Sequence, residues 1–202
     1  MEKHHQYTKG NNYNSDSDAL NCEWRQRAEI IGHAILHVFP ITLIDQKLLK
    51  QIIKNLASQK SFFSRLFSCC GEWYDDELLD FVELLKEYDW SQINWNENRQ
   101  VIPLFTEPIL AYCFPGILME IVTESFDDID ITAETLISSF LFPAIVQSDK
   151  SKLDMTRFTA EQKQVIVEFL LLLRDLLFVD DLKIQSMIND ILLRLSERFE
   201  MA

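Results

Sequence analysis

The chain of 202 residues has little glycine and little proline, with four and five residues respectively. A β-sandwich needs many turns and a nucleotide-binding loop needs glycines at fixed positions, so both classes are disfavoured. A hydrophobic content of 48% and a charged content of 25% are typical of a globular domain that can bury a core. The length leaves little room for a second domain.

Positive charge and long apolar runs are also scarce. Nineteen Lys and Arg stand against thirty-two Asp and Glu, which gives a formal net charge of −13. This balance disfavours binding to nucleic acid or to an anionic membrane, and a basic protein is the natural partner. The longest apolar run, residues 165–173, is interrupted by Glu168 and is shorter than the roughly 20 residues that span a bilayer.

Four cysteines, Cys22, Cys69, Cys70 and Cys113, occur without metal-binding spacing and without a secretory leader. We therefore expect a cytoplasmic protein with free thiols and no cofactor. The nucleophile, phosphate-loop and dinucleotide motifs of common enzymes are missing as well. The sequence thus presents no catalytic constellation.

Apolar residues at helical spacing predict an all-α fold, a compact irregular bundle of about seven or eight helices. Residues 1–21 are polar and are expected to form a flexible tail, with a single helical domain over 22–202. Helices are predicted from Glu23 to Pro40, over 42–57, over 73–88, over 106–125, over 132–140, from Thr159 and from Asp180 or Asp181, with a short helical or looped segment over 62–67.

Particular residues mark the ends of these helices. Thr106 and Thr159 are expected N-caps, and Thr159 forms a capping box with Gln162. Pro115 should kink or split its helix, and Pro143 should follow the end of another. Residues 89–105 are expected to be a connector. The last two helices should form an antiparallel hairpin.

The charge is concentrated in the middle of the chain. Residues 71–139 hold two basic and sixteen acidic residues, whereas residues 46–71 hold five basic residues and no acid. The acidic residues could simply be a solvated surface, or they could form one patch that receives a cationic protein. Nearby aromatic residues could anchor that partner, although a core role is at least as plausible for each. The candidate partner-binding residues are Asp75, Asp76, Glu77, Asp80, Glu83, Glu124, Asp127, Asp128, Asp130, Trp73, Tyr74, Trp90 and Trp95.

Two alternative functions belong to other classes. His33 and His37 are four residues apart, so a helix would place both on one face, and with nearby carboxylates they could serve a metal-dependent hydrolase. The more ordinary interpretation is a core-edge or capping role. The leucine-rich C-terminal helices could also support a self-associating scaffold, for example a homodimer.

The segments "DWSQI", "FTEPILAYCFPGILMEIV", "DDIDITAETLISSFLFP" and "FTAEQKQVIVEFLLLLRD" carry a family resemblance. Over about residues 89–178 the chain resembles small helical bacterial domains that have no assigned activity. The resemblance implies a helical fold in the bacterial cytoplasm and supplies no catalytic residues.

We therefore expect a non-enzymatic binding protein that covers the working surface of a basic partner. Its most concrete form is an immunity or antitoxin protein that neutralises a bacterial toxin effector such as a nuclease.

Overall fold

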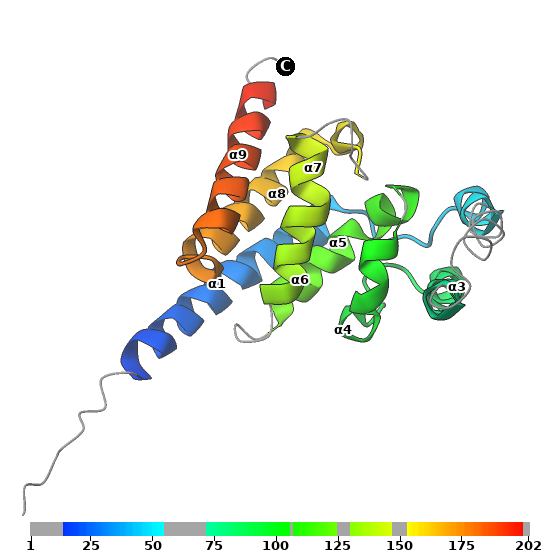
Figure 1. Cartoon of the computed structure of the whole chain (residues 1–202), viewed down its shortest axis with the longest axis horizontal. Helices are drawn as coiled ribbons and strands as arrows, with labels where there is room; N and C mark the ends of the chain where they lie inside the picture. Colours follow the sequence, from blue (N-terminus) through cyan, green and yellow to red (C-terminus); the bar gives the residue numbers. More distant parts are fainter. Residues whose placement is uncertain (1–13, 55–71, 106, 125–129, 147–152, 200–202) are drawn as a thin grey trace, which may run out of the picture.

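A computed structural model describes residues 14–54, 72–105, 107–124, 130–146 and 153–199. All the regular structure in these ranges is helical, which confirms the all-α prediction. The helices pack against one another (Figure 1). Their buried apolar side chains form one large cluster. No helix among the described residues is long and apolar enough to cross a bilayer.

The first helix, α1 (Asn14–Val38), begins earlier than predicted. Residues 14–21 belong to it rather than to a flexible tail, and residues 1–13 lie outside the described part of the chain. Asp16 and Asp18 lie in its first turns, where the helix dipole favours negative charge. These residues show no apolar periodicity, so helical spacing could not predict this part of the helix. Residues 46–54 form the next helical segment, and the expected segment over 62–67 lies outside the described residues.

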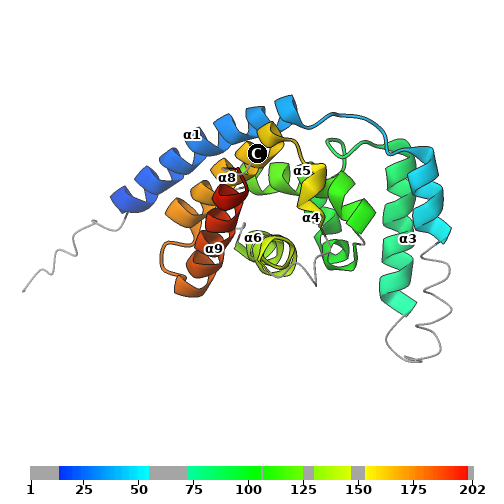
Figure 2. The same cartoon turned by 90° about the horizontal axis from the view of Figure 1, so that it is seen from above.

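The middle of the chain forms a peripheral unit. Helix α3 (Glu72–Glu87) occupies the predicted range. It contacts a 3₁₀ helix, η1 (Arg99–Leu104), which follows the short helix α4 (Trp95–Asn98). The predicted connector over 89–105 is therefore partly helical. Figure 2 shows α3 beside the 46–54 segment at one end of the molecule.

Helix α5 (Glu107–Thr123) is the central helix and is continuous through Pro115. Of the two predicted outcomes at this proline, a kink or a split, the split is therefore wrong. Ten of its seventeen residues are buried, and packing on several sides holds the helix together around the proline. It contacts α1 along its length. The expected N-cap, Thr106, lies outside the described residues.

The helix predicted over 132–140 does not end before Pro143. Helix α6 (Asp130–Thr135), the π-helical segment η2 (Leu136–Leu141) and α7 (Phe142–Ile145) follow one another without a break. The N–H of Phe142 still donates to the carbonyl of Ile137, whereas Pro143, in the first turn of α7, has no N–H to donate to the preceding turn. The wider π turn before it lets the helical path pass the proline.

The C-terminal hairpin follows the prediction. A short 3₁₀ helix, η4 (Met155–Arg157), precedes α8 (Ala160–Leu172), which continues as the π-helical segment η5 (Leu173–Leu177). Thr159 and Gln162 form the predicted capping box. Asp181 accepts hydrogen bonds from the N–H groups of Lys183 and Ile184 at the start of α9 (Leu182–Phe199), which folds back beside α8 (Figures 1 and 2).

Candidate functional site

Helix α3 has one apolar and one charged side. Leu78, Phe81, Val82 and Leu85 are buried in the core. Asp80, Glu83 and Glu87 are exposed, and Glu77 is half-buried. Lys86 is the one basic residue of the helix, and its ammonium group donates to the carboxylate of Glu83. The outer side of α3 therefore carries an excess of negative charge.

The side chains of four other candidates on this helix, Trp73, Tyr74, Asp75 and Asp76, lie outside the described residues. Their positions in the first turns of α3 place them on the same helix as Asp80 and Glu83.

Glu124, from the second acidic group, does not join this surface. Glu124 follows α5 and lines a hollow with Trp24, Arg25 and Glu29 of α1. Helix α3 lies on the other side of the molecule in both views (Figures 1 and 2). The prediction of one continuous acidic patch is therefore wrong for Glu124, because this residue lies beside α1.

Three further acidic candidates have little described structure. Asp127 and Asp128 lie outside the described residues. Asp130 begins α6, and its side chain is not among those described.

Two of the four aromatic candidates are core residues. Trp90 is 1% exposed and Trp95 is 3% exposed. The indole N–H of Trp90 donates to the carbonyl of Pro40, and that of Trp95 donates to the carbonyl of Trp90, each at 3.0 Å. Burial with a satisfied N–H is the usual structural state of tryptophan, so neither is available as a surface anchor.

Gly116 explains why Trp95 is buried. A Cβ atom at Gly116 would lie 2.4 Å from Nε1 of Trp95, so the indole ring packs directly on the backbone of α5. The ring of Phe81 lies 5.8 Å from that of Trp95 and 5.0 Å from that of Phe105. This stack joins α3 to the central helix. The pairing of Gly116 with a distant tryptophan could not be found from sequence spacing.

The histidine pair of the hydrolase alternative is on the surface of α1. Both His33 and His37 are exposed, and His33 Nε2 lies 3.9 Å from a carboxylate oxygen of Glu29. Among the described residues no three side chains of His, Cys, Asp or Glu are grouped so that they could hold a metal ion. Within the described part of the chain, the pair therefore lacks the further ligands that a metal centre would need.

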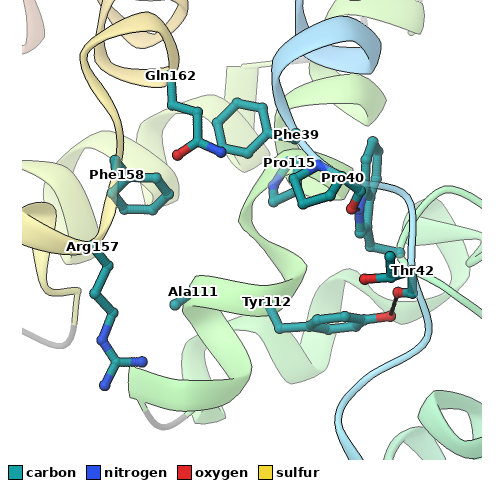
Figure 3. A pocket seen from close by; sticks show the side chains of 10 residues that line it. Phe39, Pro40, Thr42, Ala111, Tyr112, Pro115, Arg157, Phe158 and Gln162 are labelled. Atoms are coloured by element: carbon teal, nitrogen blue, oxygen red, sulfur yellow. Dashed lines mark hydrogen bonds between the residues drawn. The ribbon is translucent and has the colours of Figure 1, made fainter.

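A pocket of about 220 Å³ lies where the end of α1, α5 and the start of α8 meet (Figure 3). Its walls are mainly apolar, from Phe39, Pro40, Trp90, Pro115 and Phe158. Sequence spacing does not predict the pocket, because its lining comes from four separate segments between residues 39 and 162.

Hydrogen bonds between side chains and backbone hold the pocket walls. The hydroxyl of Tyr112 donates to the carbonyl of Thr42 at 2.9 Å, and the amide of Gln162 donates to the carbonyl of Val38 at 3.0 Å. Burial raises the pKa of Tyr112 above its usual range, so the phenol remains a donor at neutral pH. These bonds tie the 38–42 segment to α5 and to α8.

Arg157 lies at the edge of the pocket. Its Nε lies 3.1 Å from Oε1 of Glu107 and 3.9 Å from Oδ2 of Asp154. In Figure 3 the side chain of Arg157 points away from Phe158, and Ala111 is the labelled residue nearest to its guanidinium group. Hydrogen bonds from Thr156 lower the pKa of Asp154, so this carboxylate is charged at neutral pH.

No protein-family model, curated protein or solved structure matches this chain. The resemblance to helical bacterial domains thus stays a prediction from the sequence, and the function rests on the geometry of the surface and the pocket.

Proposed function

We propose that this chain is a binding protein that recognises a cationic protein through the outer side of α3. Its most concrete role is that of a bacterial immunity or antitoxin protein that covers the working surface of a basic toxin effector such as a nuclease. Carboxylates would take the place of the phosphates that such an effector binds. The prediction is narrower than the one from the sequence, because Glu124 and the two buried tryptophans no longer belong to the surface.

The observation that carries the proposal is the division of α3 into two sides. Its apolar side chains are buried, and its exposed carboxylates face solvent at the periphery of the fold. Exposed carboxylates outside the core remain hydrated, so they hardly destabilise the fold, and they are accessible to a binding partner. Charge complementarity of this kind accelerates association and rejects wrong partners.

The decisive experiment is co-expression with the product of the neighbouring gene, followed by copurification and a growth assay. We expect a complex and protection of the cells. The double reversal Asp80→Lys and Glu87→Lys should weaken the complex by about tenfold or more, because like charges would then face each other. The rate of association should also fall as salt is added.

A matched control keeps the same change in net charge on other helices. Glu134 on α6 and Asp190 on α9 are both exposed. The double reversal Glu134→Lys and Asp190→Lys should change the affinity by less than about twofold, because the altered charges lie away from the interface and are screened. Equal losses in both double variants, or no complex and no protection with the unaltered protein, would contradict the proposal.

A further inference from the structure

We infer that the pocket between α1, α5 and α8 is a receptor for one aromatic side chain of a polypeptide, held together with the backbone amides that flank it. The biological meaning rests on the proposed function, since the binding partner would supply this residue. Trp90 and Trp95, two of the aromatic residues predicted as anchors, are buried, so at this site the anchor would come from the partner and the cavity from this chain.

The size and the walls of the pocket favour a single side chain. Pockets for drug-sized ligands hold about 300–1,000 Å³, and this one is smaller, at about 220 Å³. Figure 3 shows Phe158 on one side and Pro40 and Pro115 on the other, with a slot between them. The ring of Phe158 also packs on Phe39 and Phe114, and its remaining surface and the proline rings would offer apolar contacts to an aromatic side chain. Aromatic residues that fill such pockets carry most of the energy in protein interfaces.

Arg157 supplies hydrogen-bond donors at the edge of the pocket. Within the described residues, it uses Nε for its ion pairs, which leaves its terminal nitrogens as donors. The carbonyl of a peptide amide can accept from them.

The charges around Arg157 favour a neutral ligand over an anion. One guanidinium lies beside two carboxylates, Glu107 and Asp154, so the local net charge is negative. A carboxylate ligand would gain from Arg157 but would be repelled by both acids. An amide carbonyl accepts from the guanidinium without that repulsion.

N-acetylphenylalaninamide tests the inference on the full chain without any partner protein. Binding can be followed by NMR of ¹⁵N-labelled protein. Trp90 lines the pocket, and the signal of its indole N–H is separate from the backbone amide signals. We expect this signal to shift with a dissociation constant on the order of a millimolar, as the size of the ligand predicts. The indole signals of the other tryptophans should shift less. N-acetylphenylalanine, which carries a carboxylate, should bind at least about threefold more weakly.

Two variants probe the slot and its edge. Ala111→Leu places a larger side chain in the slot and should weaken binding by about tenfold, whereas Ala19→Leu on the exposed start of α1 should leave it unchanged. Arg157→Gln removes the donors and should weaken binding by about fivefold. Arg194→Gln is its control, because Arg194 also pairs with one glutamate at 3.1 Å and is similarly exposed, at 55% against 54%.

Several results would overturn the inference. These are no shift of the Trp90 signal at a tenfold excess over the expected dissociation constant, tighter binding of the carboxylate than of the amide, or binding that Ala111→Leu does not weaken. If Ala111→Leu fails to fold, as judged by circular dichroism, Arg157→Gln decides alone. None of these results depends on the charge-reversal experiment, so the pocket and the α3 surface can fail separately.

Discussion

The central helix α5 and the peripheral helix α3 are of similar length but differ in how much of their surface is buried. Helix α5 buries residues all around its axis, including a proline and a glycine, so nearly every position is fixed by a neighbour. Helix α3 buries one side and leaves carboxylates on the other. The comparison teaches that the fold depends on α5 and on the inner side of α3, whereas the outer side of α3 is free to serve recognition.

The largest expected effect comes from the residue that joins the two helices. Phe81→Ala removes a ring that packs between Trp95 and Phe105 and leaves a cavity in the core. We expect the free energy of unfolding to fall by about 3–5 kcal/mol, which is the usual cost of such a truncation. Urea unfolding measures it. A loss below about 1 kcal/mol would show that α3 is not packed on the central part of the fold.

A smaller effect distinguishes two helical glycines. Gly116→Ala would place a Cβ atom 2.4 Å from the buried indole of Trp95, whereas Gly32→Ala in α1 would meet Val122 at 3.6 Å, an ordinary contact. We expect Gly116→Ala to destabilise by about 1–3 kcal/mol through overpacking. Gly32→Ala should stabilise by up to about 1 kcal/mol, because alanine favours the helix.

Opposite signs in the same urea titration confirm the contrast between the two glycines. If both variants are stabilised, Trp95 does not lie against α5 as described.

How much of this could be predicted from sequence differs between the two helices. Helix α3 was predicted almost to the residue, since Leu78, Phe81 and Leu85 recur at helical spacing between acidic residues. The capping box at Thr159 was found for a similar reason, because its partners are three residues apart. Local spacing fixes both features, and local spacing is what a sequence shows.

The errors concern contacts between distant residues. Pro115 was expected to be able to split its helix because a proline removes a hydrogen bond, but the burial of α5 holds the helix together. The acidic residues before and after α5 were expected to converge, yet Glu124, which follows α5, lies beside α1 and not beside α3. The pocket was not found at all, because residues near 39, 112 and 158 are brought together only by tertiary packing.

The smallest expected effect tests the free side of α3. Reversing the charge at Asp80 and Glu87 changes two exposed side chains that do not belong to the core. Lys at position 87 also lies at the end of the helix, where the dipole favours a cation. The free energy of unfolding should therefore change by less than about 0.5 kcal/mol, as for other surface substitutions. A loss of more than about 2 kcal/mol in urea unfolding would mean that these carboxylates stabilise the fold, and any loss of partner binding in the same variant could then not be assigned to the interface.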